Sequence, residues 1–589
     1  MKKALSVALT IVLMASLAGC GSNSSTTEAS SQQQQASSSE ATPQKSEEPV
    51  MAERLSERAT TNTIPAAMKE KAKSMPNANY QNLPKWHGTT LVNKSEYGWG
   101  VDGNQDDYSE GLVNELSEIG FDFIRVTQDT RIFFSEEQGE PGEYFDGDSN
   151  YVNTKELKNL DNLISWCIDK GIHVCFDVHS TPGGYMIGGD EEASRELLFT
   201  AGSKEEQIFI DFWEFMALRY ADVPNNALSF NLYNEPPRFA TDEQYTALMK
   251  KAIAAVTKAT PDRLIFVDML EYGTTPVYGL VGEKVVQTFH SYQPYEFTHT
   301  LVDNSDYEAG EAARKAEKRE VVTYPLPAIK LSIGDSGYVV NGDFNAGTIL
   351  TMRFGEGAAG AEVYLLADGN EVFRQTTSPD MIEKSGMKIN DEGNFEYWAD
   401  INPDAKKIEV TCTLPADAKE LKFKLKDPDK WLDINELIIE TDKYKTKLSG
   451  RWIEEIGDAL PPTRAKVDEN GIVSLQNDAE KYSYGKDDIE ALFKKYDDFS
   501  KETGTKIMLQ EFGDCVYTEI NGAKAFYDDV LSVCDELNIG WCHYAYDGGD
   551  FSIVAISPQY ERRGATYVEL STGRRICKEL WDVLKRHMK

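Results

Sequence analysis

Cysteine and histidine are scarce in this chain and are not spaced like metal ligands or a disulfide framework. Seven of the eight cysteines follow Cys20, an odd number, and none of them forms a CxxC motif. The seven histidines include no HExxH motif. These absences argue against structural zinc, a disulfide framework and a catalytic metal. We therefore expect buried free thiols, no metal and no cofactor.

Positive charge is scarce as well. The chain has 61 lysines and arginines against 97 aspartates and glutamates, which gives a formal net charge of -36 at pH 7. Such an acidic surface repels phosphate backbones and anionic membrane surfaces. We expect no nucleic-acid partner, whereas the binding of an uncharged substrate does not depend on this charge.

The apolar run near the N-terminus is too short to span a membrane comfortably. It reads ALSVALTIVLMASLAG, follows Lys2 and Lys3, and ends in LAGC at 17–20. These four residues resemble the lipobox of bacterial lipoproteins; the alternative is a plain signal peptide followed by a chance cysteine. The resemblance implies a lipoprotein signal peptide over residues 1–20, a lipid on Cys20, and a membrane-anchored chain that faces outside the cytoplasm.

The segment after the apolar run has the composition of a tether. Residues 21–50 are rich in Ser, Thr, Gln and Glu, with QQQQ at 32–35. A segment of this composition cannot bury enough apolar surface to fold. We expect it to be disordered, with an end-to-end distance of roughly 30 Å.

From about residue 85 the chain alternates short apolar runs with longer helical patterns such as YSEGLVNELSEIG. This alternation predicts an α/β fold with a parallel sheet. Eight such units predict a (β/α)8 TIM barrel, whose active site lies at the carboxyl ends of the strands. The predicted strands are 88–93, 121–126, 173–178, 228–233, 263–269, 285–290, 506–511 and 540–546.

The connection between strands 6 and 7 is too long for a structureless loop. Within it, over residues 321–448, strand-like runs such as TILTMRF and KELKFKL replace the helical periodicity. We predict an antiparallel β-sandwich inserted after strand 6, which divides the barrel into 51–320 (strands 1–6) and 449–589 (strands 7 and 8). Beyond it, Asn470-Gly471 predicts a small hairpin before the last helices.

The position of the insert on the catalytic face favours a carbohydrate-binding module. Trp398 and Trp431 are the candidate stacking residues. The alternative is a spacer whose aromatic residues form its own core.

Polar side chains gather where the predicted barrel strands end. A cavity lined by such groups is costly to desolvate unless they have a function. The candidates are Arg125 on strand 2, His179 after strand 3, Asn234 and Glu235 after strand 4, His290 and Tyr292 at strand 6, and Glu511 on strand 7.

Two opposed carboxylates suit glycoside hydrolysis, in which one is protonated and the other ionised. Arg125 and Tyr292 would hold Glu511 ionised, whereas Glu235 stands beside the neutral amide of Asn234. The amide of Asn234 is also placed to bond a sugar 2-hydroxyl.

Two motifs, NLYNEPPRF at 231–239 and IMLQEFGD at 507–514, resemble the catalytic signatures of glycoside hydrolase family 5, the cellulase family of the 4/7 barrel clan. The segments FDFIRV, DVHSTPGG and HSYQPYEFTH resemble its supporting motifs. The resemblance implies a retaining mechanism, with Glu511 as the nucleophile and Glu235 as the acid/base. The two carboxyl groups should then lie about 5–5.5 Å apart.

The chain departs from the family at two places. The family usually has a tryptophan at the end of strand 8 as a platform for the sugar, whereas GWCHYAYDGGD offers Trp541, Tyr544 or Tyr546. The strand 3 segment has His179-Ser180 where many endoglucanases have paired histidines, and in this it resembles the exo-acting members. The linkage, and endo or exo action, stay open.

We therefore expect a retaining β-glucanase of the endo-β-1,4-glucanase type. Mannan, xyloglucan and β-1,3-glucan stay open as substrates, as does transglycosylation. A second class of function is a non-catalytic carbohydrate-binding lipoprotein, which suits the lipobox and the tether equally well. Such a receptor would not need the two carboxylates Glu235 and Glu511 at opposed strand ends.

Overall fold

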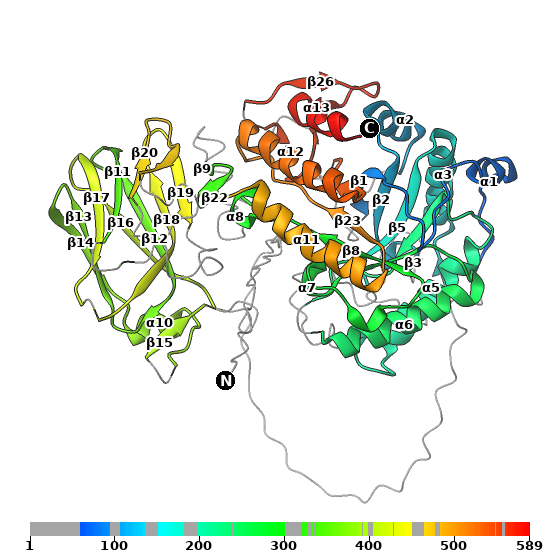
Figure 1. Ribbon diagram of the computed structural model, residues 1–589, viewed down its shortest axis with the longest axis horizontal. Helices are drawn as coiled ribbons and strands as arrows, with labels where there is room; N and C mark the ends of the chain where they lie inside the picture. Colours follow the sequence, from blue (N-terminus) through cyan, green and yellow to red (C-terminus); the bar gives the residue numbers. More distant parts are fainter. Residues whose placement is uncertain are drawn as a thin grey trace, which may run out of the picture.

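The computed structural model describes residues 59–94, 107–135, 151–181, 197–237, 240–300, 320–327, 333, 337–390, 393–397, 405–427, 429–449, 464–476, 483–547, 549–555, 560–562 and 564–588 (Figure 1). The predicted signal peptide with Cys20, the predicted tether and Trp398 lie outside these residues. No helix among the described residues is long and apolar enough to cross a membrane.

Eight parallel strands close into a barrel, which confirms the predicted fold. Each lies within a few residues of its predicted position, because barrel strands are buried on both faces and read as continuous apolar runs. The strands are β1 (His87–Lys94), β2 (Phe123–Asp129), β5 (His173–Ser180), β6 (Leu228–Asn231), β7 (Ile265–Asp268), β8 (Val285–His290), β23 (Ile507–Glu511) and β24 (Trp541–His543).

Helices cover the outside of the barrel (Figure 1). The long ones are α2 (Glu110–Ile119), α3 (Thr154–Lys170), α5 (Lys204–Arg219), α6 (Asp242–Ala259), α11 (Lys486–Thr503), α12 (Ile520–Leu537) and α13 (Lys578–His587). The short ones are α1 (Ala66–Ala72), α7 (Leu270–Gly273) and α8 (Tyr295–Thr298). Local sequence sets several of their ends. For example, Ser109 caps the start of α2 by accepting the N–H of Leu112, and Gly120 ends the helix in the left-handed conformation.

The insert consists of two sheets with a hydrophobic core of its own, which includes Val340, Phe354 and Phe423. One sheet has the order β14 (Asn370–Thr376), β13 (Glu362–Ala367), β17 (Ala418–Leu425), β11 (Tyr338–Phe344), β20 (Arg464–Val467) and β21 (Val473–Leu475). The other has the order β15 (Asn394–Glu396), β12 (Ile349–Ala358), β18 (Leu432–Glu440), β19 (Lys445–Ser449) and β9 (Glu320–Val321), and β16 (Ile408–Thr413) also pairs with β12.

The sandwich ends later than the predicted boundary at residue 448. The hairpin predicted at Asn470-Gly471 exists as β20 and β21, but β20 pairs in parallel with β11 and so belongs to the insert, not to the barrel. A local hairpin signal cannot show this, because the partner strand lies far earlier in the chain.

The two crossings between the barrel and the insert lie side by side. β10 (Leu326–Pro327) pairs with β22 (Ser483–Tyr484), so one short ribbon joins the barrel to the part of the insert beyond β9, which pairs at the edge of the second sheet before this ribbon. Tyr324 anchors this ribbon to the barrel, because its ring packs on Phe526 of α12 and its hydroxyl donates to Asp529 at 2.6 Å.

This neck predicts that the insert is dispensable for folding of the barrel. Replacing residues 328–482 with a short Gly/Ser linker should leave a cooperatively folding protein whose Tm differs by no more than about 5 °C, because the core of the insert is separate. Thermal unfolding followed by circular dichroism measures this. Loss of the cooperative transition would mean that the barrel depends on the sandwich.

Candidate active site

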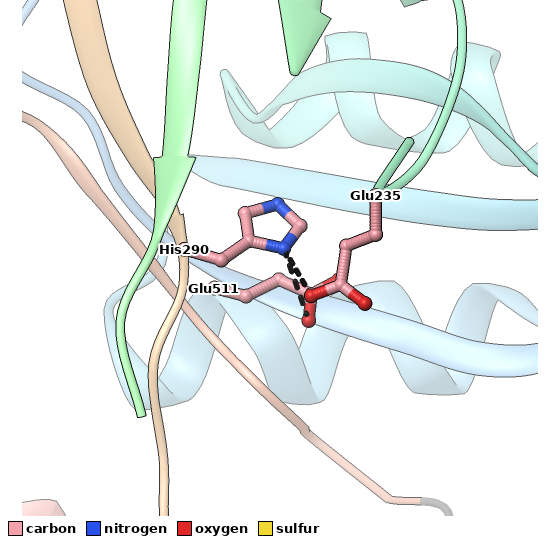
Figure 2. Close-up of side chains that lie close together, drawn as sticks. All are labelled: Glu235, His290 and Glu511. Carbon is pink, nitrogen blue, oxygen red and sulfur yellow. Dashed lines mark hydrogen bonds and ion pairs between the residues drawn. The ribbon is translucent and has the colours of Figure 1, made fainter. Parts of the chain in front are cut away.

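The two predicted catalytic glutamates meet at the carboxyl end of the barrel. Glu511 is the last residue of β23, and Glu235 lies in the turn after β6. Both side chains are buried. A carboxylate oxygen of each and a ring nitrogen of His290 all lie within 4.8 Å of one another (Figure 2). Carboxyl groups this close match the spacing of retaining glycosidases, whereas inverting enzymes need about 6.5–9.5 Å to admit a water.

Hydrogen-bond donors surround Glu511. A guanidinium nitrogen of Arg125 donates to Oε1, and the hydroxyl of Tyr292 donates to Oε2 at 2.7 Å. Burial alone would raise the pKa of Glu511, but the charges of His290 and Arg125 outweigh it and hold this pKa below its usual value. Glu511 is therefore ionised at neutral pH, as a nucleophile must be.

The environment of Glu235 shifts its pKa in the opposite direction, above the usual value. Burial raises the pKa of Glu235, and the negative charge of Glu511 adds to this, while the hydrogen bond from His290 opposes it only in part. The two glutamates thus have pKa values pushed apart, which is the condition for assigning one as the acid and the other as the nucleophile.

His290 connects the two glutamates from β8. Its Nδ1 lies 2.7 Å from Oε1 of Glu235 and 3.7 Å from Oε2 of Glu511 (Figure 2). Its Nε2 lies 3.3 Å from Asp268. Burial works against a charge on the ring, but Glu511, Asp268 and Glu235 outweigh it and raise the pKa of His290 to about 9. His290 is therefore protonated at neutral pH and donates to Glu235.

Arg125, fully buried on β2, orients the remaining predicted polar residues. Its Nη2 donates to Oδ1 of Asn234 at 2.6 Å and lies 3.0 Å from Oδ1 of Asp177. The other oxygen of Asp177 is 3.0 Å from Nδ1 of His179. Because the amide oxygen of Asn234 faces Arg125, its NH2 group is left to donate elsewhere.

Of the three candidate aromatics on strand 8, only Tyr544 reaches the site. Its ring lies 6.4 Å from that of Tyr292, and it is partly exposed. Trp541 is fully buried and packs 6.0 Å from the ring of Phe512, while Tyr546 is buried and its hydroxyl donates to Glu115 of α2.

Register explains why Trp541 does not reach the site, whereas Tyr546 lies beyond the end of β24, where the alternation no longer applies. β24 ends at His543, and side chains alternate along a strand. The ring of His543 bonds the hydroxyl of Tyr527 on α12, whereas Cys542 packs inside the barrel. Trp541 therefore faces the helices with His543, and Tyr544 faces inward.

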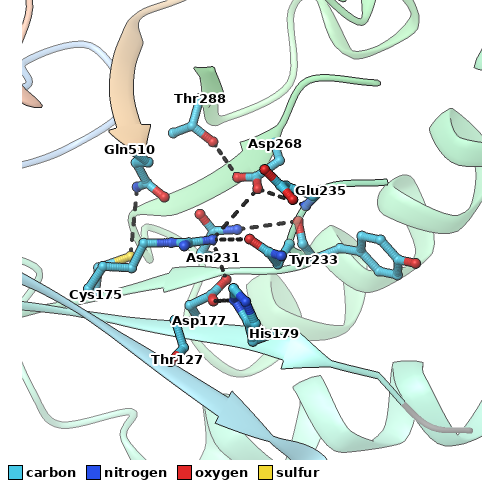
Figure 3. Close-up of polar contacts among 12 residues, drawn as sticks. Thr127, Cys175, Asp177, His179, Asn231, Tyr233, Glu235, Asp268, Thr288 and Gln510 are labelled. Carbon is cyan, nitrogen blue, oxygen red and sulfur yellow. Dashed lines mark hydrogen bonds and ion pairs between the residues drawn. The ribbon is translucent and has the colours of Figure 1, made fainter. Parts of the chain in front are cut away.

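Two carboxylates of the site were not predicted, Asp177 and Asp268. Both are fully buried; Asp177 lies in the carboxyl half of β5, and Asp268 is the last residue of β7. Asp268 accepts the backbone N–H of Glu235 at 3.0 Å and the hydroxyl of Thr288 at 2.5 Å (Figure 3). The signal that identified Glu511, a carboxylate ending an apolar strand, is also present in FDVHS and IFVDM.

Glu235, His290 and Glu511 are the one group among the described residues whose ligand-type atoms lie close enough together to hold a metal ion. The guanidinium of Arg125 and the protonated His290 already supply positive charge and protons to both carboxylates. A divalent cation would have to displace these donors, so the cluster suits proton transfer better than metal binding.

Comparison with known proteins agrees with this geometry. Residues 68–326 match the model of the cellulase family, glycosyl hydrolase family 5, so the match ends at the first strand of the neck. Endoglucanase C of Acetivibrio thermocellus is 24% identical over 226 residues, which are 38% of this chain and 56% of the relative. Cellodextrinase A of Ruminococcus flavefaciens is 23% identical over 194 residues, 32% of this chain and 53% of the relative.

A fungal protein shows about the same sequence identity to this chain as the two bacterial relatives. The probable glucan 1,3-beta-glucosidase A of Aspergillus clavatus is 24% identical over 202 residues, 34% of this chain and 44% of the relative. This chain thus spans about half the length of the curated relatives it matches. These findings lead to one conclusion: residues 68–326, which hold the first six strands of the barrel, match the cellulase family, glycosyl hydrolase family 5.

Proposed function

We propose that this protein is a retaining β-glycoside hydrolase that cleaves a β-glucan, with endo-β-1,4-glucanase action as the leading form. The observation that carries the proposal is the pair Glu235 and Glu511, close together within 4.8 Å and with pKa values displaced in opposite directions. The short distance between the two carboxyl groups predicts retention of configuration at the anomeric carbon. The opposite pKa shifts assign Glu235 as the acid and Glu511 as the nucleophile.

In the first step the ionised Glu511 attacks the anomeric carbon, and Glu235 gives its proton to the oxygen of the leaving sugar. The product is a glycosyl ester on Glu511. In the second step Glu235, now a base, takes a proton from water, and the resulting attack on the anomeric carbon frees Glu511. A sugar hydroxyl in place of that water would give transglycosylation.

The supporting residues fit substrate binding around this centre. The NH2 group of Asn234, left free to donate by the contact of Oδ1 with Arg125, is placed to bond a sugar 2-hydroxyl. The ring of Tyr544 replaces the tryptophan platform of the family beside Tyr292. Transition-state charge at the ring oxygen is stabilised by the ionised Glu511.

Reducing-sugar release from a panel of polymers tests the function. The panel contains carboxymethyl-cellulose, mixed-linkage glucan, glucomannan, xyloglucan and laminarin, because the sequence leaves the linkage and the sugar of the substrate open. Release from one or two polymers, absent with Glu511→Gln, supports the proposal and identifies the linkage. Binding without release from any polymer would favour the non-catalytic receptor.

The pKa shifts predict a bell-shaped pH dependence of kcat/KM. Activity should fall as the pH drops through the lowered pKa of Glu511, and as it rises through the raised pKa of Glu235. Steady-state rates between pH 3 and pH 10 measure both limbs. Glu235→Ala should remove the basic limb, and its persistence in that variant would assign the acid role to another group.

We infer that the insert binds carbohydrate through Trp431. This side chain is 39% exposed, and its Nε1–H donates to Oδ1 of Asn394 at 3.1 Å, which fixes the ring in place. A rigid exposed indole suits stacking on a sugar ring.

Trp431→Ala should therefore weaken binding to insoluble cellulose by about tenfold, without changing activity on a soluble oligosaccharide. Depletion assays on cellulose measure this. Tyr278→Ala is the matched control, because Tyr278 is an aromatic of the barrel that is 56% exposed. Equal affinities of the two variants would remove Trp431 from sugar binding.

We further infer that the protein is anchored to a membrane by a lipid on Cys20 and faces outside the cytoplasm. The support is the LAGC motif at 17–20 and the polar composition of residues 21–50. Recovery of a Cys20→Ala chain in the membrane fraction at the wild-type level would contradict this.

A further inference from the structure

Asp268 is the third carboxylate beside the catalytic pair, and the reaction steps above do not use it. It ends β7 and is fully buried. Its Oδ2 accepts the backbone N–H of Glu235 at 3.0 Å, and its Oδ1 accepts the hydroxyl of Thr288 (Figure 3). The same Oδ2 lies 3.3 Å from Nε2 of His290. The same Oδ2 is 3.7 Å from the guanidinium of Arg125. One carboxylate oxygen therefore faces both the backbone of Glu235 and the histidine that bonds its side chain.

The backbone contact holds Glu235 in an unusual conformation. Glu235 has a φ of 45°, in the left-handed region that costs a non-glycine residue of order 1–3 kcal/mol. Its N–H points at Asp268 and would be an unsatisfied buried donor without that partner. Asp268 thus helps to keep the carboxyl group of Glu235 aimed at the bond to be cleaved.

The contact between Asp268 and His290 determines whether the ring nitrogen beside Glu235 carries a proton. When both ring nitrogens carry a proton, Nδ1 donates to Oε1 of Glu235, and the acidic proton stays on the other carboxyl oxygen for the leaving group. If Nδ1 were bare, it would accept that proton across 2.7 Å. A general acid beside a histidine therefore works only while the histidine donates.

Among the described residues, the acidic side chains in contact with the ring of His290 are Glu235, Glu511 and Asp268. On the α7 side the backbone of Gly273 packs against the ring and brings no charge, since a Cβ at that position would lie 3.0 Å from the imidazole. Glu235 is neutral while it holds the proton that it donates as the acid, and Glu511 loses its charge when it forms the glycosyl ester. Asp268 is the one of the three whose charge the reaction leaves unchanged.

On the basis of the hydrolase function proposed above, we propose that Asp268 is a positioning residue. It keeps His290 a hydrogen-bond donor to Glu235, and it fixes the backbone turn of Glu235. It touches neither substrate nor reacting atoms, and it acts through these two residues.

Asp268→Asn tests this with almost no change in shape. The N–H of Glu235 still needs an acceptor, so the amide oxygen takes the place of Oδ2 and faces Nε2 of His290. The neutral ring then keeps its proton on Nε2, which leaves Nδ1 bare toward Glu235. We expect kcat/KM on an unactivated β-glucan oligosaccharide to fall by about 10- to 100-fold. On a dinitrophenyl glycoside, which needs no acid, the fall should be less than about threefold.

Asp177→Asn is the matched control. Asp177 is a buried carboxylate that also faces Arg125, but the contacts of the described residues link it to His179 rather than to His290 or Glu235. This variant should leave the ratio of the two substrates at its wild-type value. A merely structural role for Asp268 would lower both rates equally, as would the control.

Nuclear magnetic resonance of 15N-labelled histidine gives a readout that needs no activity. In the wild-type protein, both ring nitrogens of His290 should be protonated at pH 7, with titration at about 9. In Asp268→Asn the titration should move to lower pH. A neutral His290 in the wild-type protein, an unmoved titration in the variant, or an unchanged substrate ratio would overturn the proposal. Absence of wild-type hydrolysis on every glycoside would instead refute the hydrolase function.

Discussion

Replacing Glu511 with Gln lowers kcat/KM on β-glucan by at least about 10⁴-fold and leaves oligosaccharide affinity within about threefold of the wild type. Gln keeps the size of the side chain and an oxygen that accepts from Arg125 or Tyr292, so the site keeps its shape. It cannot form the glycosyl ester, because the amide is a poor nucleophile. Initial rates and isothermal titration calorimetry with an oligosaccharide measure the two effects.

The matched control is Glu115→Gln. Glu115 is also a fully buried glutamate, but it lies on α2 and accepts from Tyr546 outside the site. This variant separates the loss of a buried charge from the loss of the nucleophile. Hydrolysis by Glu511→Gln above about 1% of the wild-type rate would remove Glu511 as the nucleophile.

Replacing Glu235 with Ala gives a loss that depends on the leaving group. On β-glucan, whose leaving sugar must be protonated, kcat/KM falls by about 10²- to 10⁴-fold. On a dinitrophenyl glycoside the first step needs no acid, so the glycosyl-enzyme accumulates and its hydrolysis limits the rate. Azide, which attacks the intermediate without a general base, should then restore turnover and give the β-glycosyl azide.

Rates on both substrates, with and without azide, measure this effect. Equal losses on both substrates and no response to azide would assign Glu235 a structural role. The azide product distinguishes the two roles because it forms only from the ester on Glu511.

Local sequence signals were enough to predict the barrel and to place the two candidate glutamates at one end of it. Barrel strands are buried on both faces, so FDFIRV and HVCFDV read as strands without knowledge of their neighbours. Parallel strands bring their carboxyl ends to one rim, so Glu235 and Glu511 come to the same end of the barrel although they are 276 positions apart in the sequence. This prediction depends on topology, because a barrel of parallel strands places the carboxyl end of every strand at the same rim.

Features that depend on distant partners could not be predicted in the same way. The parallel pairing of β20 with β11 moves the end of the insert beyond residue 448, and no local sequence pattern predicts this pairing. The inward-facing aromatic on strand 8 depended on register: β24 ends at His543, which turns Tyr544 inward and Trp541 outward. A shift of one residue reverses the face of every side chain.

Asp268 shows a third kind of limit. A buried carboxylate at a strand end has many possible partners, and its sequence IFVDM does not differ from that of an ordinary strand end. Only the contacts with the N–H of Glu235 and with His290 show that it belongs to the acid side of the site.

The anomeric configuration of the first product tests the proposed retaining mechanism most directly. Proton NMR of an aryl β-cellooligosaccharide during the first minutes of hydrolysis shows which anomer is released before mutarotation. Carboxylates within 4.8 Å of each other predict the β anomer, because two displacements at Glu511 retain configuration. Release of the α anomer would mean a single displacement by water, and would contradict the role of Glu511 as a nucleophile.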